Sequence, residues 1–209
     1  MSREVVLGQI RAALHGKKFT APTVSQPYRR AGALDATGCL HLLEDRLREY
    51  DARVFRCSGN PREQIADILL GGGKSKIVHP AGIPREWLDE RISWTADPDG
   101  IGQLSYAHVE AFDGVMTGAT VAVGESGSIV LQHGSKEGRR ALTLLPDYHL
   151  CILFAEQVVE TLPECFDRLR STATRPTTFI SGPSATADIE MTRIKGVHGP
   201  RHLDVILVG

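Results

Sequence analysis

The chain opens with apolar residues at helical spacing and then loses all periodicity. Val6, Ile10 and Leu14 lie four residues apart, so residues 2–15 are predicted to form an amphipathic helix. Residues 16–33 follow with two prolines and paired basic residues, a composition typical of a linker or an arm. Such an arm either crosses to a partner subunit or remains a loosely packed tail.

Beyond the arm, short apolar runs alternate with helical patterns. Strands are predicted at 53–57, 77–79, 119–123, 128–131, 149–154, 177–181 and 203–208. Helices are predicted at 40–50, 60–71, 84–88, 155–162 and 162–169, and from 184 to 194. The apolar runs lack strict alternation, which is typical of parallel strands that are buried on both faces. The pattern therefore predicts an N-terminal helix and basic arm over 1–33 and an α/β domain over 34–209, with a mainly parallel sheet and an antiparallel hairpin near 119–131.

Two local signals add detail to this pattern. Residues 161–164 read Thr-Leu-Pro-Glu, a capping box that restarts a helix after the interruption at Pro163. Residues 132–140 form a polar loop that holds Lys136, Arg139 and Arg140, and such charged runs are usually solvated.

The strand predicted at 177–181 leads into a concentration of small polar residues. Ser181, Gly182, Ser184 and Thr186 surround a break in the pattern, after which a helix is predicted. A turn that enters a helix presents free N–H groups, and ligands bind outside the carboxyl ends of strands in open α/β sheets. The same residues are also common helix caps, so the residues themselves leave a ligand site and a structural turn both open.

A second candidate is the Glu125-Ser126-Gly127 turn between the two predicted hairpin strands. Thr117 and Gly118 precede it in a region dominated by small residues, which indicates close packing or close approach of a ligand. Glu125 is either a surface carboxylate or a group that faces a ligand. We expect this turn and the 181–190 loop to converge on one cleft.

Charged residues after the break are further candidates. Asp188 and Glu190 fall in the first turn of the predicted helix, where they stabilise the helix dipole or act directly on a ligand. Arg193 either pairs with a nearby carboxylate or binds a substrate carboxylate with two hydrogen bonds. His198 lies between glycines in a tight loop, where it stabilises the turn or serves a function.

Composition narrows the class of protein. Among 209 residues, Lys and Arg total 24 and Asp and Glu total 25, so nothing indicates a nucleic acid or membrane partner. The sequence lacks an apolar run of transmembrane length and a signal-peptide pattern, which predicts a cytoplasmic protein.

The cysteine and histidine spacing predicts that this chain holds neither a metal nor an iron–sulfur cluster. Cys39, Cys57, Cys151 and Cys165 are widely separated and form no CxxC pair, so we expect reduced and mostly buried thiols. His198 and His202 are four residues apart, but the Gly-Pro pair between them prevents the helical geometry of a metal site.

Four motifs together resemble the LUD domain family, in its short lactate-utilisation protein C type: Thr117-Gly118-Ala119, the 125–128 turn, the 181–190 segment and the 196–200 loop. The resemblance extends over about residues 35–209. It implies a three-layer α/β/α fold like that of ribose-5-phosphate isomerase and the class I CoA transferases. It also implies a part in oxidising lactate to pyruvate, alongside partner proteins that carry iron–sulfur clusters.

Three functions follow from this resemblance and from the residues. The first is a non-redox subunit of a lactate-oxidising iron–sulfur system, which binds partner subunits or a small carboxylate or phosphate ligand. The second is an independent enzyme acting on a small carboxylate, sugar phosphate or acyl-CoA, because the Glu125 turn is similar to the turn that bears the catalytic glutamate of CoA transferases. Here Ser126 stands where those enzymes carry Asn. The third is a ligand-sensing module.

Overall fold

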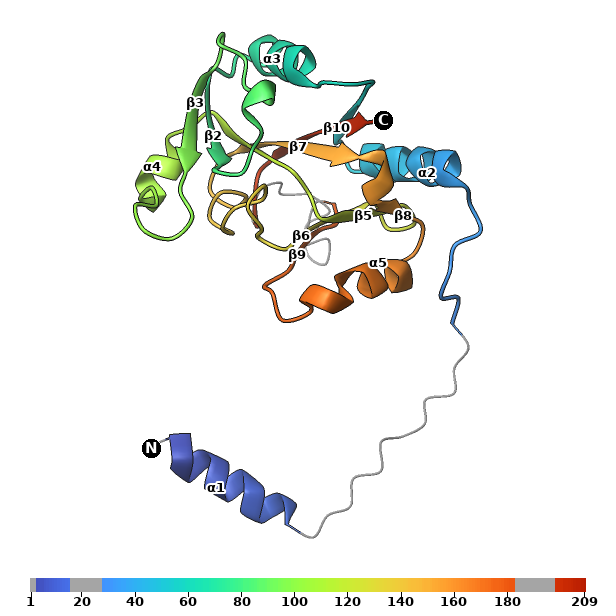
Figure 1. Cartoon of the computed structure of the whole chain (residues 1–209), viewed down its shortest axis with the longest axis vertical. Helices are drawn as coiled ribbons and strands as arrows, with labels where there is room; N and C mark the ends of the chain where they lie inside the picture. Colours follow the sequence, from blue (N-terminus) through green and yellow to red (C-terminus); the bar gives the residue numbers. More distant parts are fainter. Residues whose placement is uncertain (1–2, 16–27, 183–197) are drawn as a thin grey trace, which may run out of the picture.

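Two β-sheets form the centre of the structure (Figure 1), a computed structural model that describes residues 3–15, 28–182 and 198–209. Every neighbouring pair of strands in the larger sheet is parallel. In spatial order its six described strands are β1 (Arg53–Cys57), β10 (His202–Val208), β7 (Tyr148–Phe154), β4 (Gly114–Thr117), β2 (Lys76–Pro80) and β3 (Ser93–Asp97). The predicted α/β class with a mainly parallel sheet is therefore confirmed.

The predicted hairpin belongs to a second sheet and is not part of the large one. In spatial order the four described strands of the small sheet are β8 (Val158–Val159), β5 (Val121–Val123), β6 (Ser128–Leu131) and β9 (Thr178–Ile180). β6 pairs antiparallel with both β5 and β9. The strands before the Glu125 turn and before Ser181 thus lie in the same sheet, as the convergence prediction requires.

Helices pack on both sheets, except the first described helix, which buries no residue. The described helices are α1 (Arg3–Leu14), α2 (Ala36–Glu49), α3 (Arg62–Gly71), η1 (Arg85–Trp87), α4 (Tyr106–Glu110), η2 (Ala155–Gln157), α5 (Leu162–Leu169) and η3 (Arg170–Thr172). None of them has the length and continuous apolar character that a membrane crossing requires.

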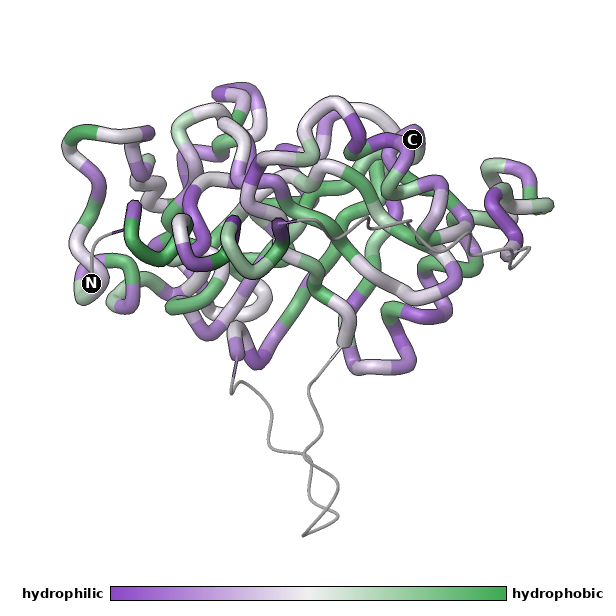
Figure 2. Tube along the Cα trace, turned by 90° about the horizontal axis from the view of Figure 1, so that it is seen from below, coloured by the Kyte–Doolittle hydropathy of each residue, from purple (hydrophilic) through white to green (hydrophobic). Residues whose placement is uncertain are grey.

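Three of the four apolar clusters among the described residues lie between the layers. Ile65 of α3 and Trp87 of η1 pack on one face of the large sheet. Leu43 of α2 packs in the cluster between the two sheets, and Leu169 of α5 packs against the outer face of the small sheet. Figure 2 shows that hydrophobic segments gather in the middle of the molecule, while many outer loops are hydrophilic. This burial is the main source of stability.

Side-chain caps fix where two helices begin. Asp35 accepts a hydrogen bond of 2.7 Å from the Gly38 N–H at the start of α2. At the start of α5, Thr161 and Glu164 each accept a hydrogen bond from the other's backbone N–H. The predicted capping box is confirmed, and α5 begins where it placed the restart.

The helix predicted over 155–162 is wrong. Only a short 3₁₀ turn forms there, and Val158 and Val159 then make a strand that pairs parallel with β5. Both valines are buried. The apolar spacing that indicated a helical face therefore comes from residues that are buried in a strand. Two β-branched residues favour the strand, and tertiary pairing decides the outcome.

The predicted N-terminal helix is present as α1, and none of its described residues is buried. Val6, Ile10 and Leu14 are all more than two fifths exposed. The described part of the arm begins at Tyr28. It lies against α5 and the end of β8 and leads into α2.

Candidate functional site

A chain of three serine hydroxyls joins the predicted turn to the end of β9. Ser126 Oγ lies 2.8 Å from Ser128 Oγ, which lies 2.6 Å from Ser181 Oγ. Ser128 is buried, whereas Ser126 and Ser181 are exposed. Because β6 pairs with β9, the turn before β6 and the residues after β9 lie side by side. The described start of the 181–190 loop therefore does meet the turn.

Two glycines let the carboxyl end of α2 approach this turn. Gly127 and Gly182 both have positive φ, at 62° and 82°. A Cβ atom on Gly127 would lie 2.8 Å from Arg46 Cβ, and one on Gly182 would lie 3.1 Å from the Tyr50 ring. The Tyr50 hydroxyl donates to the Gly127 carbonyl at 2.5 Å, and burial raises the pKa of Tyr50 so that it stays protonated. These glycines are thus required by packing.

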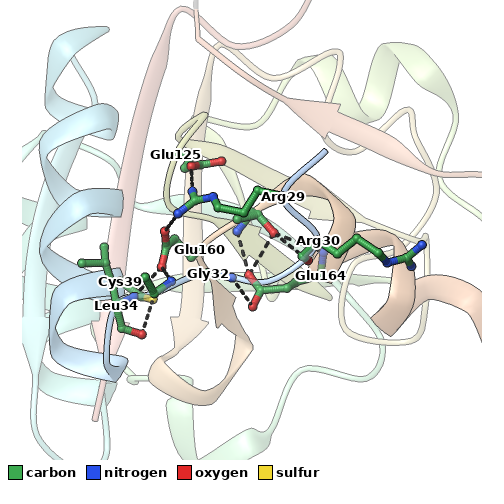
Figure 3. A network of polar contacts seen from close by, with 10 residues as sticks. Arg29, Arg30, Gly32, Leu34, Cys39, Glu125, Glu160 and Glu164 are labelled. Atoms are coloured by element: carbon green, nitrogen blue, oxygen red, sulfur yellow. Dashed lines mark hydrogen bonds and ion pairs between the residues drawn. The ribbon is translucent and has the colours of Figure 1, made fainter. Parts of the chain in front are cut away.

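The Glu125 carboxylate is half-exposed and already paired. Arg29, from the N-terminal arm, donates through Nη2 to Glu125 and through Nη1 to Glu160 at 2.7 Å (Figure 3). One guanidinium group therefore bridges two carboxylates from two neighbouring connections of the small sheet. The Glu125 backbone N–H also donates to the Glu160 carbonyl at 3.0 Å, which fixes the position of the turn.

Glu160 holds the arm in place. It is 5% exposed, and its Oε2 accepts hydrogen bonds of 2.6 Å from the backbone N–H groups of Ala33 and Leu34. These N–H groups, led by that of Leu34, and Arg29 keep the pKa of Glu160 below its usual value. Neither Arg29 nor Glu160 was predicted as a site residue, because their contact spans 131 positions and no local pattern marks it.

Gly32 faces Glu160 with no room for a side chain, and it provides a test of this docking. A Cβ atom there would lie 2.5 Å from Glu160 Cβ and 2.6 Å from Glu160 Cδ. We expect Gly32→Ala to destabilise the chain by about 1–3 kcal/mol through overpacking and to expose the arm to proteases. Thermal unfolding and limited proteolysis measure both effects. Gly71→Ala is the control, because an added Cβ there meets open space.

Thr117 and Gly118 lie in a different place, at the carboxyl end of β4 in the large sheet. Thr117 Oγ1 donates to the Gly118 carbonyl and lies 2.8 Å from Nε2 of His149, and both side chains are buried. Burial, helped by the positive charge of Arg140, lowers the pKa of His149 to about 4. Sequence spacing did not indicate His149, which lies on β7, the strand paired with β4.

The remaining candidates divide into one that is described and several that are not. His198 is exposed, and its carbonyl accepts a hydrogen bond of 3.1 Å from Nη2 of Arg140. Candidates outside the described residues, whose roles stay predictions, are Ser184, Thr186, Asp188, Glu190 and Arg193.

The charged loop at 132–140 is not simply solvated. Arg139 is one fifth exposed and donates through Nε and Nη2 to Asp97, which is buried. Arg140 is half-buried. Glu137 is buried and accepts hydrogen bonds from the Thr120 hydroxyl and from the backbone N–H of Gln132. The loop therefore contributes to the interior, and Arg139 and Glu137 are held by specific partners, whereas Lys136 is exposed.

The cysteines are part of the packing. Cys39, Cys151 and Cys165 are buried in the apolar clusters, and burial raises the pKa of each thiol, for Cys151 to about 12. The described residues contain no group of three or more His, Cys, Asp or Glu side chains that could hold a metal ion.

Comparison with known proteins agrees with this architecture. The sequence model of the LUD domain matches residues 84–208. Lactate utilization protein C of Deinococcus radiodurans is 38% identical over 206 residues, which cover 98% of this chain and 94% of that protein. Lactate utilization protein C of Bacillus subtilis strain 168 is 32% identical over 183 residues, covering 83% and 70%. The crystal structure of a DUF162 family protein from Deinococcus radiodurans superposes with a TM-score of 0.73 at 37% identity, covering 85% of this chain and 100% of that one. The chain therefore belongs to the LUD domain family, and within it to the lactate utilization protein C type.

Proposed function

We propose that this protein takes part in the oxidation of L-lactate to pyruvate as a subunit that works with iron–sulfur proteins and carries no redox centre itself. The observation that carries this proposal is the similarity to a protein named Lactate utilization protein C, which extends over 98% of the chain and 94% of that relative. A relation of this extent covers both sheets and the arm, and not only an isolated motif.

The packing of the cysteines supports a role without a cluster on this chain. Iron–sulfur clusters are held by thiolates that converge on one site. Three of the four cysteines fill apolar clusters instead, and burial keeps their thiols protonated. Electron transfer would therefore be supplied by partner proteins.

The surface around the Glu125 turn is the proposed contact with a ligand or a partner. Ser126 and Ser181 are exposed at the two ends of the serine chain, and Arg29 presents its guanidinium beside Glu125. Hydroxyls next to a half-exposed ion pair offer donors and acceptors without large apolar area, which suits a polar guest or the rim of a protein interface.

The same geometry supports a second candidate function, an enzyme that uses Glu125 on a small acid or acyl-CoA. Its support is the half-exposed carboxylate on a tight turn beside Ser126. For Glu125 to act as a nucleophile, Arg29 would have to move away from it. A copy that carries Glu125→Gln, placed in a strain that lacks the chain, distinguishes the two functions. Restored growth on L-lactate supports the subunit role, because an amide cannot replace a nucleophilic carboxylate.

A deletion experiment tests the proposed function. We expect a strain that lacks this chain to fail to grow on L-lactate while growing normally on pyruvate, because only the oxidation step is lost. A plasmid copy of the wild-type chain should restore growth. Normal growth of the deletion strain on L-lactate, with no second copy of the gene present, would show that the proposal is wrong.

A further inference from the structure

Arginines in this chain repeatedly bind carboxylates with one edge of the guanidinium group. Nε and Nη2 both donate to the same carboxylate in the pairs Arg53–Asp204, Arg56–Glu44, Arg91–Asp89, Arg139–Asp97 and Arg201–Asp147. This two-donor edge matches the two oxygens of a carboxylate and gives one of the stronger hydrogen-bonded pairs in proteins.

Arg140 departs from this pattern. Its Nη1 donates to the carbonyl and the hydroxyl of Thr143 at 2.8 and 3.1 Å, and its Nη2 donates to the His198 carbonyl at 3.1 Å. Among the described residues, Nε makes no hydrogen bond and no carboxylate pairs with this group. The side chain is nevertheless half-buried, and burial lowers the pKa of Arg140. A charge withdrawn from water without a counter-ion is costly.

The acids nearest to Arg140 in the sequence are committed elsewhere. Glu137 accepts from the Thr120 hydroxyl and from the backbone N–H groups of Gln132 and Gly134. Asp147 is bound by both donors of Arg201. Among the described residues, the carboxylates nearest to Arg140 in the sequence are thus held by other partners.

The surroundings of Arg140 contain neutral hydrogen-bonding groups. Leu142, two residues on, packs in one cluster with Val115, which is paired with His149 across the sheet. The turn after Arg140 therefore packs on the strand that is paired with β7, and the charge of Arg140 acts on the buried His149 ring, which contacts Thr117. Because Thr117 donates to the Gly118 carbonyl, it accepts from Nε2–H of His149, which leaves Nδ1 of His149 as an acceptor.

We propose that Arg140 binds the carboxylate of a small 2-hydroxy acid, with the neutral His149 ring accepting a hydrogen bond from the acid's hydroxyl group. Arg140 offers its Nε and the second hydrogen of Nη2 as donors for the carboxylate, and Nδ1 of His149 offers an acceptor for the hydroxyl group. This inference rests on the proposed function for its choice of L-lactate as the probe. It goes beyond that function by assigning ligand binding to this chain and to residues that no sequence motif marks.

Calorimetric titration of the purified full-length chain with L-lactate, propionate and inorganic phosphate tests the assignment. We expect L-lactate to bind more tightly than propionate, which lacks the hydroxyl, and more tightly than phosphate. Arg140→Lys keeps the charge but loses the two-donor edge, and should weaken L-lactate binding by about tenfold or more. Arg201→Gln is the matched control and should bind as the wild type does, because the Arg201 edge is already filled by Asp147.

A second measurement needs no change at Arg140. The His149 ring signals in nuclear magnetic resonance spectra should shift on addition of L-lactate to the wild-type chain, with His149→Gln used only to assign them. The proposal is overturned if the wild type binds no L-lactate, if Arg140→Lys binds it unchanged, or if phosphate binds equally well. If the wild-type chain binds no L-lactate but its deletion still abolishes growth on L-lactate, only the assignment of the ligand to this chain is wrong. The proposed subunit role then still stands.

Discussion

Replacement of Asp97 by Ala is expected to lower the free energy of unfolding by about 3–5 kcal/mol. Asp97 is buried at the end of β3 and accepts hydrogen bonds from both donors of Arg139 and from the backbone N–H of Leu104 at 2.8 Å. Its removal leaves the guanidinium of Arg139, only one fifth exposed, without a counter-ion, and it leaves the Leu104 N–H without a partner. Denaturant unfolding measures the loss.

A matched pair on the surface provides the control for Asp97. Arg201 binds Asp147 with the same two donors, but the two side chains are 59% and 49% exposed. Asp147→Ala should therefore cost less than about 1 kcal/mol, because water replaces the lost partner. Equal losses for the two variants would show that burial does not govern how much these ion pairs contribute to the free energy of unfolding. The 132–140 loop would then not be part of the interior.

His149 is expected to make the stability of the chain depend on pH in a defined window. Its pKa is lowered from 6.5 to about 4 by burial and by Arg140, so the folded state favours the neutral ring. The stabilisation is complete above the unfolded value of 6.5. It is lost as the pH falls toward the folded value, because the unfolded chain binds the proton first. The shift corresponds to about 2–3 kcal/mol between about pH 7 and about pH 4.5.

The measurement compares the wild type with His149→Gln, which retains hydrogen-bonding groups but does not titrate. Carboxylates titrate in the same range in both proteins, so only the difference between the two curves reports on His149. We expect the wild type to lose about 2–3 kcal/mol more than the variant on acidification from about pH 7 to about pH 4.5. Parallel curves would mean that the pKa of His149 is the same in the folded and unfolded chains.

The fold class could be predicted from sequence because its signals are local. The strand at 53–57 and the one at 128–131 have the predicted bounds, and the capping box at Thr161 fixes the start of α5. The strand β8 could not be predicted, because two valines become a strand only when β5 supplies a partner. For the same reason sequence spacing did not reveal that the hairpin forms a separate sheet.

The candidate site was predictable only where residues are close in sequence or mark a turn. The Glu125 turn and Ser181 stand out by their small polar residues, and β6 brings them together. Arg29 and Glu160 carry no such signal, since the arm reaches them across more than a hundred residues. Whether a charge such as Arg140 is solvated or withdrawn from water depends on the packing of the loop around it, which no local pattern encodes.

We propose that this chain works in lactate oxidation with partners that carry the redox centres. The most direct test is to purify a tagged copy from cells grown on L-lactate and to measure iron content and lactate-dependent reduction of an artificial electron acceptor. We expect the complex to contain iron and to reduce the acceptor, and the chain purified alone to do neither. Lactate-dependent reduction by the isolated chain, or a chain that brings down no iron–sulfur protein under these conditions, would contradict it.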